Sequence, residues 1–140
     1  MQAETSHIDE LLECLVFLTR FYGVPNSQDA LTTGLPLVSG RLSTALFSRA
    51  AERGGLSARE VIQPLEQISP LLLPCVLQTR HGGACILLEW SKDRSQAKVI
   101  FPQAGDAAQW VSTAQLGDEY NGRLFFVKKQ FKFDERSPKV

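Results

Sequence analysis

The stretch CVLQTRHGGACILLEW, residues 75–90, decides the fold class of this 140-residue chain. It contains two runs rich in Val, Ile and Leu, Cys75–Thr79 and Ala84–Trp90, on either side of the glycine pair Gly82 and Gly83. This pattern predicts two strands joined by a hairpin turn. The run CILLEW is apolar on both faces, so its strand is expected in the middle of a sheet with helices on one side.

The sequence on either side of this hairpin predicts helices before residue 55 and mainly strands after it. Apolar residues recur at helical spacing from Leu11 to Tyr22, after a capping box formed by Ser6 and Asp9 and before Gly23. Further elements are expected as helices at residues 27–31, 42–54 and 112–119, and as strands at residues 58–62, 97–101 and 124–129. Helices followed by an antiparallel sheet predict an α+β fold, in which the N-terminal helices pack on one face of the C-terminal sheet.

Composition and charge exclude several functional classes. Hydrophobic residues make up 44% of the chain and charged residues 21%, which is typical of a folded globular domain. Lys plus Arg and Asp plus Glu both number 15, so no net positive field attracts nucleic acid. The longest apolar stretch, residues 71–77, is broken by Pro74 and is too short to span a membrane. The N-terminus lacks the features of a signal peptide, so a cytosolic location is expected.

The three cysteines, Cys14, Cys75 and Cys85, indicate neither a disulfide framework nor a metal site. Their number is odd and none forms a CxxC pair. If the turn at Gly82 and Gly83 is tight, Cys75 and Cys85 are expected on opposite faces of the sheet. They would then be unable to form a disulfide.

An ordered set of short motifs runs along nearly the whole chain. They are FYG at residues 21–23, GLPL at 34–37, LLLPCVL at 71–77, ILLEW at 86–90 and VIF at 99–101. This order resembles the bacteriocin-processing cysteine peptidases, papain-like domains fused to the N-termini of peptide-exporting ABC transporters. The GLPL loop and the Phe-Asp-Glu-Arg segment at residues 133–136 are most similar to a degenerate branch that serves exporters of large RTX toxins and adhesins.

The resemblance implies that the residues needed for peptidase chemistry are replaced. A cysteine peptidase needs a thiolate, a histidine that activates it and a group that orients the imidazole. The position of the nucleophile falls on Glu10, that of the general base on Ala84 and that of the orienting aspartate on Pro102, or on Asp106 with a gap. The glutamine of the oxyanion hole falls on Glu4. The resemblance therefore implies a domain that binds an exported protein without cutting it.

Two other functions stay open on sequence grounds. One is an active cysteine hydrolase that uses Cys14, with His81 as its base, although Cys14 lies on the apolar face of its helix and a turn histidine is expected in solvent. The other is a structural module that contacts only the transporter's own domains. Trp90 and Trp110 are expected mainly in the core, but aromatic residues are favoured at binding hot spots. They are therefore candidate substrate-binding residues, together with Glu10 and Ala84.

The resemblance also implies a domain organisation and a cellular context. Residues 1–133 are expected to form the peptidase-like domain, and residues 134–140 to begin a linker to a transmembrane domain. The implied partners are an unfolded RTX-type toxin or adhesin and the transmembrane and nucleotide-binding domains of the same transporter, at the cytoplasmic face of the bacterial inner membrane. No P-loop motif occurs here. This domain is thus expected to need no cofactor, and ATP and Mg would belong to the full-length protein.

Overall fold

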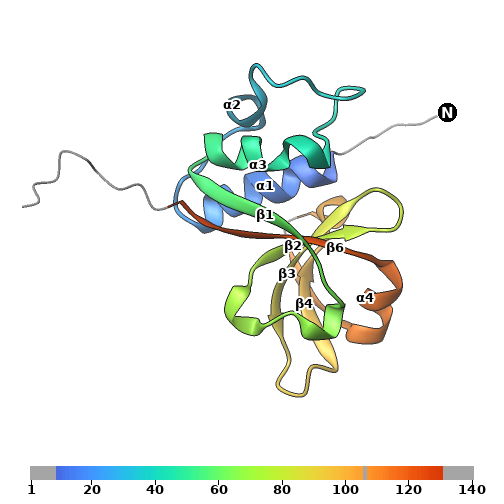
Figure 1. Ribbon diagram of the computed structural model, residues 1–140. Coiled ribbons are helices and arrows are strands. Elements are labelled where there is room, and N and C mark those ends of the chain that lie inside the picture. The colour runs from blue at the N-terminus through green and yellow to red at the C-terminus, as the bar shows by residue number, and fades with distance from the viewer. Residues whose placement is uncertain (1–8, 106, 131–140) are drawn as a thin grey trace, which may run out of the picture.

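The computed structural model describes residues 9–105 and 107–130, which fold around one six-stranded antiparallel sheet (Figure 1). The strand order is β1-β6-β2-β3-β4-β5, so the last strand in the sequence lies between the first two. The strands are β1 (Leu56–Ile62), β2 (Cys75–Thr79), β3 (Ala84–Trp90), β4 (Gln96–Ile100), β5 (Ala108–Ser112) and β6 (Tyr120–Lys129). The helices are α1 (Glu10–Phe21), α2 (Gln28–Thr32), α3 (Thr44–Arg53) and α4 (Thr113–Glu119), with 3₁₀ turns η1 (Leu65–Gln67), η2 (Pro70–Leu72) and η3 (Pro102–Ala104). The predicted α+β class is confirmed.

Helix α1 begins where Asp9 caps its N-terminus. One carboxylate oxygen of Asp9 accepts a hydrogen bond from the Leu12 N–H at 3.3 Å. The other accepts from the Leu42 N–H at 2.7 Å and so fixes the loop that leads into α3. The cap is thus Asp9, whereas the sequence pattern had placed it at Ser6, which lies outside the described residues. As a result Glu10 is the first residue of the helix.

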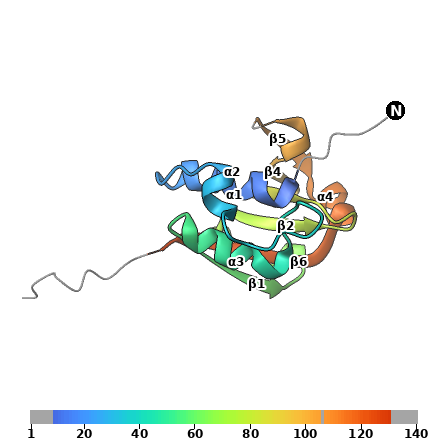
Figure 2. The same cartoon turned by 90° about the horizontal axis from the view of Figure 1, so that it is seen from above.

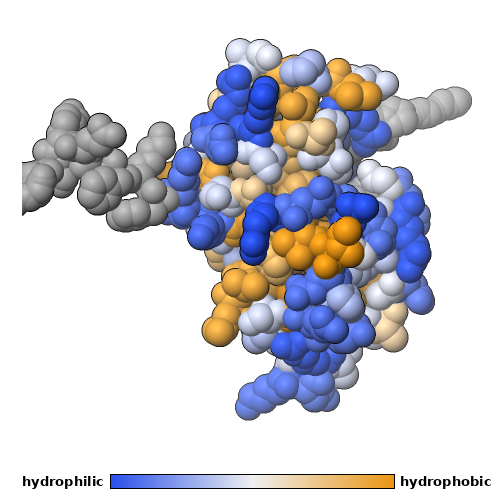
Figure 3. Space-filling view, viewed as in Figure 1, coloured by the Kyte–Doolittle hydropathy of each residue, from blue (hydrophilic) through white to orange (hydrophobic). Residues whose placement is uncertain are grey.

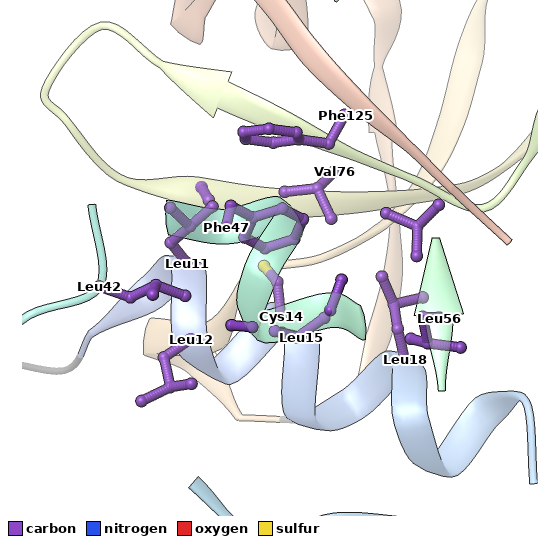
Figure 4. Packing of buried hydrophobic residues seen from close by; sticks show 14 of the residues in the cluster. Leu11, Leu12, Cys14, Leu15, Leu18, Leu42, Phe47, Leu56, Val76 and Phe125 are labelled. Carbon is purple, nitrogen blue, oxygen red and sulfur yellow. The ribbon is translucent and has the colours of Figure 1, made fainter. Parts of the chain in front are cut away.

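The first face of the sheet is covered by α1 and α3, as Figure 4 shows. Leu15 and Leu18 of α1 are fully buried against this face. Phe47 of α3 stacks on Phe125 of β6, with ring centroids 4.2 Å apart. Truncating a buried leucine or phenylalanine of this kind costs about 2–5 kcal/mol, so this cluster fixes where α1 lies on the sheet.

The second face of the sheet is also covered, which corrects the prediction that helices lie on one side only. Leu77 and Leu87 project into a second apolar cluster, where they are covered by Leu65 and Ile68 around η1 and by Leu116 of α4. In Figure 1, α4 lies on the side of the sheet away from α1 and α3. The run CILLEW is apolar on both faces because each face packs against a separate cluster.

Strand β5 was not predicted from the sequence. It is an outermost strand, and its side chains are exposed except for the half-buried Val111. An exposed edge strand need not carry the alternating apolar pattern by which strands are recognised.

Cys75 and Cys85 lie on the same face of the sheet, contrary to prediction. In the β2–β3 ladder Cys75 pairs with Leu87, and Leu77 pairs with Cys85. The loop between the strands closes with the Thr79 N–H donating to the Gly83 carbonyl, so it is longer than a tight turn at Gly82 and Gly83. The pairing is therefore offset by an odd number of residues from that of a tight turn at Gly82 and Gly83, and an odd offset reverses the face on which one strand's side chains lie. Both thiols are free.

Candidate functional site

A cleft of about 580 Å³ opens at the end of the sheet where β3 begins and β4 ends. The N-terminal end of α1, the turn η3 and helix α4 surround it. Seen from above (Figure 2), that end of α1 lies beside the β4–β5 region, in agreement with the contacts between α1 and η3. Segments far apart in the sequence therefore form one site.

Three residues predicted from the sequence as the positions of a catalytic centre meet in this cleft. Glu10, Ala84 and Pro102 all line it. The Glu10 Oε1 atom accepts a hydrogen bond from the Ala84 N–H at 2.9 Å. The Glu10 Oε2 atom accepts from the side-chain amide of Gln103, directly after Pro102. The carboxylate thus joins α1 to both β3 and η3. Glu4 and Asp106 lie outside the described residues.

Gly83 permits this close approach of α1 to β3. A Cβ atom at Gly83 would collide with the Glu10 Oε1 atom, far inside van der Waals contact. The Oγ1 of Thr79 accepts a hydrogen bond from the Gly83 N–H at 3.0 Å and holds the glycine in place. Neither Gly83 nor Gln103 was predicted as a site residue, because their roles depend on a carboxylate more than 70 residues away in the sequence.

His81 and Glu119 lie together at the rim of the cleft. The Nε2 atom of His81 is 3.0 Å from the Oε1 atom of Glu119, and their side chains are 70% and 45% exposed. The prediction that His81 is exposed to solvent is confirmed. An exposed pair of this kind contributes little to stability. Its position leaves both groups accessible to a molecule in the cleft.

None of the three cysteines lines the cleft, and Cys14 is fully buried as predicted. Burial, and next the neighbouring Cys85 thiol, raises the pKa of Cys14 well above its ordinary value. Burial likewise raises the pKa of Cys85 to about 12 and that of Cys75 above its ordinary range. Because the thiolate is the nucleophile in cysteine chemistry, these protonated thiols are poor candidates for a catalytic group at neutral pH.

The structure does not bring Trp90 or Trp110 to Glu10 and Ala84. The Trp90 indole N–H donates to the Ile68 carbonyl at 3.0 Å, and its ring packs partly buried at the opposite end of β3 from Ala84. Trp110 is 46% exposed on β5, where it is opposite Lys98, so the prediction that it lies mainly in the core is wrong. Its neighbours along β5 line the cleft, and successive side chains of a strand point to opposite faces. A role in binding for either tryptophan stays a prediction.

The described part of the chain offers no group of three or more His, Cys, Asp or Glu side chains that could hold a metal ion. No helix within those same residues has the length and apolar character needed to cross a membrane.

A solved structure with both the fold and substantial sequence similarity is the N-terminal peptidase C39-like domain of the toxin secretion ATP-binding protein from Vibrio parahaemolyticus. It is 40% identical, covers 89% of this chain and all of the solved chain, and superposes with a TM-score of 0.85. The chain therefore belongs to the family of N-terminal peptidase C39-like domains. The peptidase-like family predicted from the ordered motifs is confirmed.

Two further solved structures share the fold at much lower identity. The peptidase domain of Streptococcus ComA, described as a bi-functional ABC transporter, is 16% identical with a TM-score of 0.73 and covers 87% of this chain and 92% of its own. A double glycine motif protease from an AMS/PCAT transporter, in complex with its leader peptide, is 15% identical with a TM-score of 0.70 and covers 91% and 90%. No protein-family model and no curated protein matches the chain.

Proposed function

We propose that this chain is the non-catalytic recognition domain of a type I secretion ABC exporter, which binds an unfolded RTX-type toxin or adhesin before export. It would lie at the cytoplasmic face of the bacterial inner membrane, next to the transmembrane and nucleotide-binding domains of its own transporter. ATP and Mg would be used by the latter. The 40% identical relative, an N-terminal domain of a toxin secretion ATP-binding protein, supports this context.

The carboxylate of Glu10 is the single observation that carries the proposal. The resemblance assigns the nucleophile to Glu10, the general base to Ala84 and the orienting group to Pro102. A methyl group and a pyrrolidine ring cannot accept or orient a proton, and a carboxylate cannot replace the thiolate of a cysteine peptidase. Both oxygens of Glu10 already accept hydrogen bonds, from the Ala84 N–H and from Gln103. Glu10 therefore joins three segments of the chain, α1, β3 and η3.

The cleft itself supports the binding part of the proposal. Its lining includes the amide side chains of Gln103, Gln109 and Gln115, each of which carries both hydrogen-bond donors and acceptors. Such groups suit the N–H and C=O groups of an extended peptide backbone, which are also donors and acceptors. A peptidase-type cleft without a nucleophile can hold a polypeptide and release it uncut.

A cleavage assay tests the catalytic half of the proposal. The chain is incubated with double-glycine leader peptides and with the cognate exported protein, and the products are identified by mass spectrometry. We expect no cleavage, for the wild type and for Cys14→Ala alike. Specific products that disappear in Cys14→Ala would establish a cysteine hydrolase instead.

An NMR titration tests the binding half. Isotope-labelled domain is titrated with the unfolded exported protein, and we expect saturable shifts with a Kd in the micromolar range, roughly −8 kcal/mol or weaker. If no segment of the exported protein causes shifts while the transporter's own ATPase domain does, the chain is a structural module.

A further inference from the structure

A second concave site, the basic groove, lies beside the C-terminal end of α1, whereas the cleft lies at the N-terminal end of that helix. It has a volume of about 540 Å³, and its lining includes Arg59, Lys128, Phe126 and the leucines at 71–73. Across the β1–β6 ladder Arg59 pairs with Phe126 and Ser57 with Lys128. Alternation along a strand thus puts Arg59, Phe126 and Lys128 on one face of the sheet, with η2 as the neighbouring wall.

The apolar part of the groove is incompletely covered. Leu71 is 90% exposed and Leu72 is 48% exposed, although both belong to the short turn η2. In Figure 3 hydrophobic surface gathers over this lower-left part of the molecule, next to hydrophilic surface along β1. Two adjacent exposed leucines beside a phenylalanine form an apolar surface of the kind that marks an interaction site.

The charged part of the groove has one sign. Arg59 and Lys128 line it, and no Asp or Glu does so among the residues that the structure describes. Glu60, next to Arg59 in the sequence, lies on the other face of β1, where its Oε2 accepts a hydrogen bond from Gln78 at 2.8 Å. Neither Arg59 nor Lys128 forms an ion pair with a residue that the structure describes. In a chain with 15 basic and 15 acidic residues, this local excess of positive charge favours an anionic partner.

The spacing of the two cations fits an extended chain. Arg59 and Lys128 are diagonal neighbours across the β1–β6 ladder, a relation that separates the residues by roughly 7–8 Å. Carboxylates two residues apart in an extended segment lie on the same side at roughly 6.6–6.8 Å, so each can face one cation.

We propose that the basic groove binds an extended, acidic segment of the exported polypeptide, with a leucine-sized side chain held between Phe126 and the η2 leucines. This inference rests on the proposed function. A second copy of the chain fits less well, because a two-fold interface would place Arg59 and Lys128 against the same residues of the other copy. The concave shape also fits a side chain better than a flat lipid surface.

The test measures binding of labelled synthetic peptides by fluorescence anisotropy. One peptide is unfolded and carries alternating Asp with interspersed Leu, the second has Lys in place of Asp, and the third has Ser in place of Leu. The charge-reversed variant is Arg59→Glu with Lys128→Glu, and the apolar variant is Leu71→Ser. Lys92→Glu, an exposed cation in the β3–β4 turn outside the groove, is the matched control for charge.

We expect the wild type to prefer the Asp–Leu peptide, and charge reversal to weaken its binding by at least about tenfold. Leu71→Ser should weaken it by about threefold, whereas Lys92→Glu should change it by less than about twofold. Added salt should weaken binding to the wild type and to Lys92→Glu, because exposed charges are screened.

Several results overturn the proposal. The proposal is wrong if the charge-reversed variant binds the Asp–Leu peptide as tightly as the wild type does. It is also wrong if the wild type binds the Lys peptide as tightly as the Asp–Leu peptide. Binding only to vesicles that contain phosphatidylserine, or a groove-dependent dimer in sedimentation without peptide binding, also overturns it.

The unfolded exported protein, tested in parallel, separates the two proposals. If the wild type and the charge-reversed variant bind it equally, the groove assignment is wrong and the proposed function stands. If the wild type does not bind it at all, the proposed function fails.

Discussion

The cleft and the basic groove are similar in volume, about 580 and 540 Å³, but opposite in chemistry. Within residues 9–105 and 107–130, the cleft is lined by the carboxylates of Glu10 and Glu119 and by no Lys or Arg. Over the same residues, the groove is lined by Arg59 and Lys128 and by no Asp or Glu. At the cleft, long-range hydrogen bonds of Glu10 join α1 to β3 and η3, whereas the groove presents exposed leucines. The difference teaches that a peptidase-like fold can carry, besides the cleft, a second recess of opposite charge on the same sheet.

The largest expected effect separates the core under α1 from the apolar wall of the groove. Leu15→Ala should lower the free energy of unfolding by about 2–5 kcal/mol, because Leu15 is fully buried under α1. Leu71→Ala should lower it by less than about 0.5 kcal/mol, because its side chain is 90% exposed. Urea unfolding measures both. Equal losses would show that η2 packs more tightly than the structure indicates.

A smaller effect tests the hydrogen bonds that Glu10 accepts at the cleft. Gly83→Ala should cost about 1–3 kcal/mol, because the new methyl group displaces the Glu10 carboxylate and leaves the Ala84 N–H without its acceptor. In a Glu10→Ala background the same substitution should cost much less, because the carboxylate that the methyl group would displace is absent. Binding of the Asp–Leu peptide should be unchanged throughout. If the two substitutions lower the free energy of unfolding additively in this double-mutant cycle, a glycine at position 83 is not required by the Glu10 carboxylate.

Next in size is a pH effect on the buried thiols, which neither site exposes. Burial raises the pKa of the Cys85 thiol to about 12, so the folded state keeps its proton while the unfolded chain loses it above pH 9.0. The thiol's contribution to the free energy of unfolding is fully present below pH 9.0. It falls as the pH rises toward the folded pKa, by up to about 1.4 kcal/mol per pH unit for each such thiol. Urea unfolding between about pH 8 and about pH 10 should show a weaker decline in Cys85→Ala than in the wild type. An identical pH profile for the two proteins would contradict this origin.

The smallest effect concerns Cys14. Cys14→Ala should cost roughly 1 kcal/mol, as small core truncations do, and leave binding at both sites intact. Thiol-specific reagents should label Cys14 only in unfolded protein, because it is fully buried and its pKa is raised. Fast labelling of Cys14 in the folded domain, or loss of binding in Cys14→Ala, would make it a functional residue.

Local patterns predicted most of the elements well. The bounds of β2 and β3 were obtained from the apolar runs around Gly82 and Gly83. The helix expected at residues 112–119 is α4, which Ser112 caps, since its Oγ accepts from the Gln115 N–H at 3.0 Å. The edge strand β5 and the face of Cys85 were missed. The face of Cys85 depends on the register of the β2–β3 pairing, which the length of the loop after Thr79 decides. β5 lacks the alternating apolar pattern because most of its side chains are exposed.

The candidate site was predictable only in part. Aligning the motifs placed Glu10, Ala84 and Pro102 at one centre, and the structure puts all three in the cleft. The roles of Gly83 and Gln103 became visible only with the Glu10 carboxylate in place. The basic groove had no sequence signal, because Arg59 and Lys128 are about 70 residues apart and become neighbours only in the β1–β6 ladder.

The position of β6 inside the sheet also bears on how the domain is made by the ribosome. Its Lys129 pairs with Leu56, and β1 has no other strand as a neighbour in the described sheet. While the ribosome is still translating the segments before residue 120, β1 has no partner, and β2 lacks one of its two. Contacts of such long sequence separation slow folding. The nascent chain should therefore stay protease-sensitive until β6 has left the exit tunnel, and then gain its protection in one late step.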